Sequence, residues 1–540
     1  MHSMLSYRLH PHEECVRGDS SCELAIEEKG IDVFSRGPFS DGGHVFRYDV
    51  RMFDASTLRL YNSLTKREEE FVPITDKSVL MYTCGPTVYG RPHIGNYSSF
   101  LMADLLRRWL EVKGYRVTHA KNITDVGHLV ADRDEGEDKV EKQAKAERVD
   151  PLAIARKYEE QFLEDEKALN LHEPEVRPRA TETIKEMLVM VKELLANGHA
   201  YETEDGIYFD VRTFPAYGTL SGNTVENLES GARIAVNEAK KHPADFAVWK
   251  KTVGENAQHL LRWSYATGER VSTTGDDPSA GFPGWHIECS AMSRKHLGPQ
   301  IDIHTGGEDN IFPHHESEIA QSESTGPHPF SKYWLHKRRI DMGDAKMSKS
   351  LGNILTVPDV VAKGFSPLDL RYYFLSVHYR TNLKFTWRGL EDARKARRRI
   401  VEWMKEMGQL PVVEDGQALA IGDQIARYAG QFTKAMDADL NTPAALAAVF
   451  DCMAWSRNVP AWSQEGVEEL RSCIQMVRQT FGCFEPEAEE IPSAVQKLVE
   501  ERSHARANKD FLASDSLRNQ IEALGYEVKD TANGQQVRRK

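Results

Sequence analysis

Two short segments of the chain carry residues suited to holding phosphate. The first, His93-Ile94-Gly95-Asn96, stands where a short apolar run and a loop lead into a helical period. A helix start offers free backbone N–H groups and a partial positive charge, which favour phosphate. Glycine lets a ligand approach the backbone closely, and histidine can donate to phosphate oxygens. The alternative is that His93 only caps its own helix.

The second segment is Lys346-Met347-Ser348-Lys349-Ser350, which lies between Gly343 and Gly352. Two lysines three residues apart, beside two hydroxyl groups in a glycine-bounded loop, form a cationic clamp. Such lysines offset the negative charge that develops as pyrophosphate leaves. The alternative is a solvated basic loop without a ligand.

Candidate metal ligands are spread over more than 200 residues. His314 and Glu318 are four apart in Phe312-Pro313-His314-His315-Glu316-Ser317-Glu318, so on a helix they share one face and suit one metal ion. Cys289 lies upstream and could be a third ligand, and Cys84 ends an apolar run and could be a fourth. The alternatives are a buried structural cysteine and a His–Glu hydrogen bond at the surface.

The elements around the first segment predict a doubly wound α/β fold. Residues 79–84 form a short apolar run that reads as a buried strand. Residues 93–113 have a helical period that Gly114 closes, and residues 115–120 read as the next strand. This β–loop–α–β unit places Cys84 and His93 at the carboxyl edge of a Rossmann-like parallel sheet, where such sheets bind ligands.

The rest of the chain divides by pattern into further parts. Residues 1–55 hold mixed charge and no sustained period, so we interpret them as a disordered extension, or Met52 as the true start. Residues 56–335 read as the nucleotide fold with an α+β insertion at about 130–275, which includes a strand at 206–210. Residues 390–485 read as a helical bundle. Residues 494–540 read as a small α+β domain, with one long helix ending near Gly525 and a strand at 526–528.

Composition places the chain among ordinary globular proteins. It has 540 residues, a formal charge of −13, 40% hydrophobic residues and seven cysteines. These values exclude a collagen-like chain and a disulfide scaffold, no run is apolar enough to span a membrane, and the cysteine content favours a reducing cytoplasm. The acidic balance argues against a sequence-blind polyanion binder but leaves two basic stripes, at 336–339 and 394–399. The alternative for each stripe is a solvated helix face.

Taken together, the motifs resemble those of cysteinyl-tRNA synthetases, in the class I aminoacyl-tRNA synthetase family. The His-Ile-Gly and Lys-Met-Ser-Lys-Ser pair resembles the class signature. The narrower resemblance rests on segments 60–65, 84–89, 284–292, 312–316, 437–443 and 505–511, and it covers about residues 58–540.

The resemblance implies a zinc site and an ATP site. The family's zinc ligands map onto Cys84, Cys289, His314 and Glu318, zinc binds the thiolate of substrate L-cysteine, and Trp285 walls the pocket. ATP with Mg²⁺ is expected at His93, Gly95, Asn96, Lys346 and Lys349, with His93, Lys346 and Lys349 as the catalytic residues. Because a zinc–thiolate bond excludes serine and alanine, we expect no editing domain.

The resemblance also implies the roles of the later parts of the chain. Residues 336–389 become a connecting domain with the lysine loop, 390–485 a tRNA-binding bundle and 494–540 an anticodon-binding domain. The expected partner is tRNA(Cys), and a monomer is favoured. Contacts of Lys395, Arg397 and Arg398 with the tRNA backbone are a hypothesis.

Two residues depart from the family pattern. Asn96 replaces the second histidine of the class motif, so it can donate a hydrogen bond but cannot carry charge. Val537 stands where the family often has tryptophan, which weakens a stacking contact with the anticodon there.

Two other functions are alternatives for a chain with these motifs. The cysteine ligase of mycothiol synthesis resembles this family but joins cysteine to an amino sugar and lacks the C-terminal RNA-binding part. Residues 390–540 therefore favour tRNA as the acceptor. A synthetase-like protein that binds without catalysis should have lost the lysine loop or a zinc ligand, and both are present.

Overall fold

The computed structural model describes most of the chain after residue 55. The described ranges are 56–129, 137–225, 239–273, 277–342, 345–346, 354–413, 421–485, 492–531 and 534–539. The expected extension at 1–55, with Met52, therefore lies outside the described residues. So do residues 347–353 of the lysine loop.

The central element is a four-stranded parallel sheet of order β10-β9-β3-β4. Its strands are β3 (Ser78–Thr83), β4 (Arg116–Lys121), β9 (Ile301–Gly307) and β10 (Ser331–Lys337). Because all four strands run in the same direction, their carboxyl ends share one edge. This sheet confirms the predicted Rossmann-like α/β fold.

Helix α1 (Ile94–Val112) connects β3 to β4 and covers one face of the sheet. Its apolar residues recur at helical spacing, and Leu101, Leu106 and Trp109 are fully buried in the core that it shares with β3 and β10. Gly114 follows with a φ of 82°, which glycine adopts without strain. The predicted helix at 93–113 differs only at its two ends, where His93 and Lys113 are the caps.

The insertion holds helices followed by a small antiparallel sheet of order β5-β6-β7-β8. Its helices are α2 (Lys139–Glu147), α3 (Pro151–Ala168) and α4 (Ile184–Ala196). Its strands are β5 (Ala200–Glu202), β6 (Gly206–Phe209), β7 (Phe246–Lys251) and β8 (Gly281–Pro283). The sheet thus extends past residue 275, where we expected it to end, because the Gly-Phe-Pro strand is defined by its pairing with β7 rather than by its own pattern.

Short elements precede and follow the strands of the central sheet along the chain. The hairpin β1 (Arg59–Asn62) and β2 (Arg67–Glu70) precedes β3. Helix α6 (Trp285–Leu297) follows β8, and a π-helical turn (Ile311–His315) leads into α7 (Glu316–Thr325). The next elements are β11 (Ile340–Met342), β12 (Ala345–Lys346), α8 (Val357–Ala362), α9 (Pro367–Leu375) and β13 (Leu383–Phe385).

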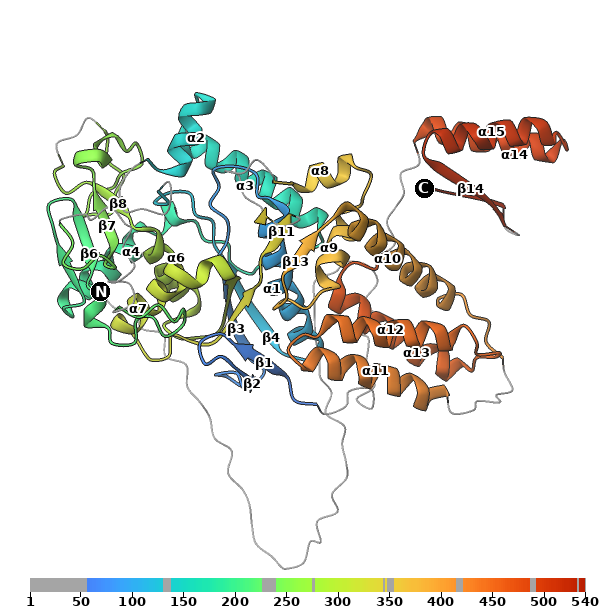
Figure 1. The fold of residues 1–540 in the computed structure, drawn as a ribbon, viewed down its shortest axis with the longest axis horizontal. Helices are drawn as coiled ribbons and strands as arrows, with labels where there is room; N and C mark the ends of the chain where they lie inside the picture. The colour runs from blue at the N-terminus through green and yellow to red at the C-terminus, as the bar shows by residue number, and fades with distance from the viewer. Residues whose placement is uncertain are drawn as a thin grey trace, which may run out of the picture. The chain divides into compact units, whose positions relative to one another are not determined.

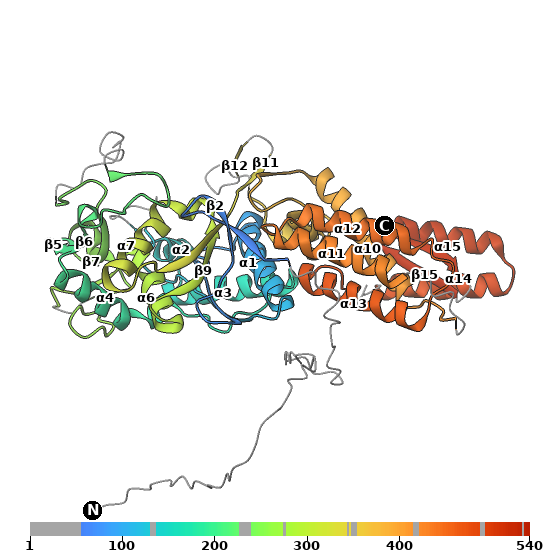
Figure 2. The ribbon, with the colours of Figure 1, turned by 90° about the horizontal axis from the view of Figure 1, so that it is seen from below.

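Helices dominate the rest of the chain. A bundle is formed by α10 (Trp387–Met407), α11 (Ile421–Asp437), α12 (Thr442–Ser456) and α13 (Gln464–Phe481) (Figure 1). The last elements are α14 (Ser493–Ala507), α15 (Phe511–Ala523), β14 (Tyr526–Thr531) and β15 (Gly534–Arg539). Figure 2 shows α14 and α15 side by side.

The prediction of one long helix ending near Gly525 is wrong. The chain breaks after Ala507, because Lys509 takes a φ of 59° and Asp510 caps a new helix by accepting from the backbone N–H of Ala513. The two shorter helices pack on β14 through a small core that includes Val495, Ile521 and Val528.

A buried ionic network joins the sheet domain to the bundle. Asp104 on α1 accepts from Arg108 Nε at 2.7 Å and from the guanidinium of Arg371 on α9. Arg371 also donates to the carbonyl oxygen of Phe481 at 2.6 Å, at the end of α13. All three charged side chains are less than a tenth exposed, so the two guanidinium groups depend on Asp104 for a compensating negative charge.

Among the helices of the described ranges, none is both long enough and apolar enough to cross a membrane.

Candidate active site

The four candidate metal ligands meet in one buried cluster at the carboxyl edge of the sheet. Cys84 directly follows β3, Cys289 lies in α6, His314 lies in the π-helical turn, and Glu318 lies in the first turn of α7. Their ligand atoms all lie within 4.8 Å of one another. The sulfur atoms of Cys84 and Cys289 are 3.7 Å apart, and the sulfur of Cys84 is 3.3 Å from Glu318 Oε1.

Two close backbone approaches hold these elements in place. A Cβ atom at Gly85 would lie 1.7 Å from the carbonyl oxygen of Asn122, so glycine allows Cys84 to sit against the loop that follows β4. A Cβ atom at Gly284 would lie 2.0 Å from the carbonyl oxygen of Ala247, so glycine also allows α6 to start against β7. These glycines bring the two cysteines toward the same point.

The helix expected to carry both His314 and Glu318 begins later than predicted. It starts at Glu316, because Phe312 is extended (φ −138°, ψ 133°) and the following turn is π-helical. The spacing of four residues still places His314 Nε2 3.0 Å from Glu318 Oε1.

The cluster fits a tetrahedral zinc ion in its geometry and its donor chemistry. Two zinc-bound sulfurs at about 2.3 Å from the metal are about 3.8 Å apart at the tetrahedral angle. The Cys84–Cys289 separation of 3.7 Å matches this value. Two sulfurs, one imidazole nitrogen and one carboxylate oxygen form a donor set that zinc accepts, and all four residues are buried.

Two further histidines orient the ligands. His304 Nε2 lies 2.9 Å from Glu318 Oε2, which leaves Oε1 directed at the cluster. His286 Nδ1 lies 3.0 Å from His314 Nδ1, which leaves Nε2 of His314 directed there. Such outer contacts fix ring orientation and tune ligand basicity in metal sites.

The electrostatics of the cluster favour one thiolate and one carboxylate, whereas burial and the neighbouring Cys289 and Glu318 raise the pKa of Cys84 well above its ordinary value. Burial opposes the ionisation of Cys289, but the thiol of Cys84 and the ring of His314 outweigh it and lower the pKa of Cys289 to about 6. Burial likewise opposes the charge of Glu318, but His304 and His314 lower the pKa of Glu318 to about 2. A thiolate and a carboxylate are the forms that metal binding requires.

Trp285 lies beside this cluster as a flat wall. Its ring stacks on His128 at a centroid distance of 3.9 Å and on His314 at 4.3 Å. His128 Nδ1 lies 2.6 Å from Thr87 Oγ1, in the loop that follows Cys84. The expected pocket residue is therefore in contact with an expected metal ligand.

His93 and Asn96 cap each other at the start of α1. The backbone N–H of Asn96 donates to His93 Nδ1 at 3.2 Å, and the backbone N–H of His93 donates to Asn96 Oδ1 at 3.1 Å. His93 therefore does cap its own helix, as the alternative interpretation predicted, but it uses only Nδ1 to do so. Because Nδ1 accepts, the proton of the neutral ring lies on Nε2, which is a donor. Asn96 likewise keeps its amide NH₂ group as a donor.

The lysine loop is described only in part. Lys346 ends β12, which pairs with β11 in an antiparallel register that sets Lys346 opposite Asp341. The side chain of Lys346 and the whole of Lys349 lie outside the described residues. The structure therefore places the start of the loop and leaves the predicted clamp as a prediction.

Comparisons with known proteins point to one family. The family model of the class I (C) tRNA synthetase catalytic domain matches residues 70–395. A cysteine–tRNA ligase of Chlorobaculum tepidum is 38% identical over 509 residues, covering 89% of this chain and 98% of its own length. A cysteine–tRNA ligase of Thermus thermophilus is 39% identical over 487 residues, covering 88% and 98%.

The chain belongs to the cysteine–tRNA ligase family. Family models also match its C-terminal part: a DALR domain at residues 431–485 and a cysteinyl-tRNA ligase anticodon-binding domain at residues 488–538. Among solved structures, an Agrobacterium radiobacter LeuRS in complex with tRNA and LeuAMS has a TM-score of 0.52 at 11% identity. The superposed region covers 77% of this chain and 85% of the LeuRS chain, so the two proteins share a fold.

The sequence did not identify the histidines that contact the metal ligands or Trp285 in this member of the cysteine–tRNA ligase family. His286, His304 and His128 contact the ligands or Trp285, but none belongs to a spacing pattern. A signal was present for His304, which is a polar residue directly after Ile303 in a strand that is almost entirely buried. A polar side chain at such a position needs a partner.

The hypothesis that Arg397 contacts tRNA is wrong. Arg397 is 4% exposed, donates from Nε to Asp369 at 2.8 Å, and donates to the carbonyl oxygen of Cys483. It therefore joins α10 to α9. Lys395, on another face of α10, has a side chain 66% exposed and stays a candidate. Within the basic stripe at 394–399, Arg397 therefore packs between helices whereas Lys395 lies at the surface.

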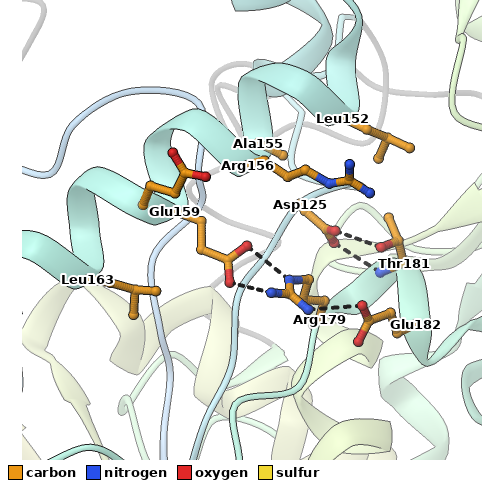
Figure 3. Close-up of a pocket in the computed structure, with 10 residues that line it drawn as sticks. Asp125, Leu152, Ala155, Arg156, Glu159, Leu163, Arg179, Thr181 and Glu182 are labelled. Carbon is orange, nitrogen blue, oxygen red and sulfur yellow. Dashed lines mark hydrogen bonds and ion pairs between the residues drawn. The ribbon is translucent and has the colours of Figure 1, made fainter.

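A cavity of about 420 Å³ lies away from the cluster, between α3 and the segment 179–182 (Figure 3). Two buried carboxylates in its lining are already satisfied: Glu159 accepts two hydrogen bonds from Arg179, and Asp125 accepts from the backbone N–H and the hydroxyl of Thr181. We assign no ligand to this cavity.

Proposed function

We propose that this chain is an ATP-dependent ligase that joins L-cysteine to tRNA(Cys). The buried Cys84–Cys289–His314–Glu318 cluster beside Trp285 carries the proposal, since it offers a thiol-selective pocket at the ligand-binding edge of the sheet. A carboxylate oxygen of cysteine attacks the α-phosphorus of ATP, and the bond to the leaving pyrophosphate breaks. A hydroxyl of the terminal ribose of tRNA then attacks the carbonyl carbon, and AMP leaves.

The four ligands would hold one zinc ion. When bound, zinc supplies a soft site that takes the substrate thiolate and lowers its pKa. His304 and His286 fix the orientation of Glu318 and His314 toward that site, and Trp285 limits the size of the amino-acid pocket. Because a serine hydroxyl is a poor ligand in such a pocket, discrimination of roughly 10⁴ follows without a second, editing site.

The phosphates of MgATP would lie at the start of α1. The partial positive charge of the helix start and the donor nitrogen of His93 attract them, and Gly95 leaves the backbone open to close approach. Asn96 would donate through its amide group. Lys346 and Lys349 would stabilise the charge that builds on pyrophosphate, with Lys349 nearest to ATP.

The C-terminal part favours tRNA over an amino sugar as the acceptor. Relatives named cysteine–tRNA ligase match over 98% of their own length, and an anticodon-binding model matches residues 488–538. A protein that only binds tRNA has no need of a preserved metal cluster and lysine loop. We also propose a monomer that works in the cytoplasm, in line with five buried free cysteines among the described residues.

Amino-acid-dependent exchange between ATP and labelled pyrophosphate tests the first half of the proposal. Cysteine should drive the exchange, and serine at equal concentration should drive it roughly 10⁴-fold less efficiently. A protein that activates serine as well as cysteine would contradict the thiol-selective pocket. A protein without exchange, but with bound tRNA, would contradict catalysis.

A further inference from the structure

Lys337 is a buried lysine at the carboxyl edge of the catalytic sheet. It is the last residue of β10 and is 3% exposed. Its ammonium donates to the carbonyl oxygen of the next residue, Arg338, at 3.1 Å. Among the described residues, no carboxylate lies within ion-pair distance of its Nζ. A buried ammonium without an anion is unfavourable, so its presence calls for a reason.

Glu308, the carboxylate that interacts electrostatically with Lys337, is hydrogen-bonded to the two residues that follow Lys337. Glu308 Oε2 accepts from Arg338 at 2.7 Å, and Glu308 Oε1 accepts from the backbone N–H of Arg339 at 3.3 Å. Burial, only partly offset by Glu308, lowers the pKa of Lys337 to about 8. This corner of the sheet therefore holds three cationic side chains and two carboxylates, and both carboxylates are engaged by the arginines: Glu308 by Arg338, and Asp341 by Arg339 at 3.0 Å.

The side chain of Lys337 belongs to the same face of the sheet as α1. Tyr333 and Leu335, two and four residues earlier on β10, pack in the core that contains α1, whereas Trp334 and His336 contact the histidines beside the metal cluster. Side chains alternate along a strand, so Lys337 continues the α1 face.

The first turns of α1 come close to the partner of Lys337 in the ladder. Lys337 pairs with Gly307 of β9, so their backbones are about 4.8 Å apart. A Cβ atom at Gly307 would lie 3.2 Å from Ser99 Oγ, in the second turn of α1. A lysine side chain can span this separation and reach an anion held at the start of α1.

We propose that Lys337 is a further ATP-binding residue, whose ammonium turns from the Arg338 carbonyl to bind a phosphate of the nucleotide held at the start of α1. This inference rests on the proposed function. It adds a third lysine, fixed on the sheet, to the two in the lysine loop. A charge held on a strand is ordered before the nucleotide arrives, so little conformational entropy is lost on binding. Its burial is then a cost to the free protein that nucleotide binding offsets.

Lys337→Met tests the proposal in cysteine-dependent ATP–pyrophosphate exchange. Loss of a charge-assisted hydrogen bond should raise the KM for ATP about tenfold and leave the KM for cysteine unchanged. Lys337→Arg, which keeps the charge, should have a smaller effect. The matched control is Lys332→Met at the opposite end of β10, where the ammonium donates to the Val72 carbonyl; this variant should keep the KM of the wild type.

Thermal unfolding separates binding from stability. Free Lys337→Met should unfold at the same temperature as the wild type or higher, because an unpaired buried charge has gone, and should gain less in melting temperature from added MgATP. An unchanged KM for ATP would overturn the proposal, as would an effect confined to the KM for tRNA. Should Lys337→Met not fold, a wild-type KM for ATP and normal MgATP stabilisation in Lys337→Gln, which also removes the charge, would overturn it as well. Wild-type protein without exchange would instead contradict the proposed function.

Discussion

The sulfur atoms of Cys84 and Cys289 lie 3.7 Å apart although 205 residues separate the two cysteines along the chain. Cys84 ends a strand of the parallel sheet, and Cys289 lies one turn into the helix that follows the insertion. After the insertion, the chain therefore comes back to the carboxyl edge of the parallel sheet, where Cys84 lies. This contact makes the metal cluster a product of the whole catalytic domain rather than of a local motif.

Cys289→Ala should abolish the metal site. We expect zinc content to fall from about one ion per chain to nearly none, and cysteine-dependent exchange to fall by more than about 100-fold, because three ligands leave the site open. Zinc is measured by atomic spectroscopy on the purified protein. The matched control is Cys452→Ala, a buried cysteine of α12 in the bundle, which should keep its zinc. Full zinc content in Cys289→Ala would refute the ligand assignment.

His304→Phe should weaken zinc binding, although His304 is not one of the four proposed ligands. Phenylalanine can keep the ring contact with Trp334, at a centroid distance of 4.3 Å, but loses the nitrogen that holds Glu318 Oε2. We expect zinc affinity, measured by competition with a chelator, to fall about 10- to 100-fold. His304→Gln should recover part of this loss, since its amide nitrogen can reach Glu318. Equal affinities in all three proteins would show that His304 does not act through Glu318.

Asp104→Asn should destabilise the junction between the sheet domain and the bundle. Burial opposes the charge of Asp104, but Arg108 and Arg371 outweigh it and hold the pKa of Asp104 well below its ordinary value. Removing this charge leaves two buried guanidinium groups without their anion, so we expect a loss of about 3–5 kcal/mol in the free energy of unfolding. Urea unfolding at pH 7 measures it. Glu147→Gln, at an exposed ion pair with Lys157, is the control and should change little.

The same residue predicts how stability depends on pH. Because folding lowers the pKa of Asp104, its contribution is fully present above the unfolded value of about 4 and declines as the pH falls below it. Wild-type protein should therefore lose more stability than Asp104→Asn between pH 5 and pH 3. Parallel pH profiles for the two proteins would contradict the assignment.

Lys395→Glu and Arg397→Glu should have different effects although both lie on α10. Lys395 is exposed, so reversal of its charge should raise the KM for tRNA severalfold, most strongly at low salt, and leave ATP–pyrophosphate exchange unchanged. Arg397 is buried against Asp369, so its reversal should lower the melting temperature. Aminoacylation at two salt concentrations separates them. An unchanged KM for tRNA in Lys395→Glu would remove this residue from the interface.

The sequence was sufficient for the features that depend on local pattern. The parallel β–α–β unit follows from apolar runs and from Gly114, and spacing suggested His314 and Glu318 as a pair. Features set by tertiary contacts were not predicted. The burial of Arg397 depends on Asp369, which lies on another helix, and the break in the C-terminal helix depends on the backbone conformation of Lys509.

The resemblance to a family suggested the full set of four metal ligands, which residue spacing alone did not. No local pattern joins Cys84 to Cys289, and the structure shows that they meet where α6 packs against β3 and β4. His304 and His286 act through the metal ligands, so their roles became visible only with the structure.

Transfer of labelled cysteine to tRNA tests the central claim most directly. Purified protein is incubated with bulk tRNA, MgATP and labelled cysteine, and acid-precipitable label is counted before and after ribonuclease. We predict label that ribonuclease removes, that requires ATP, and that excess unlabelled serine does not reduce. Cysteine-dependent ATP–pyrophosphate exchange without labelled tRNA would contradict the account, because it would show an active core that serves another acceptor.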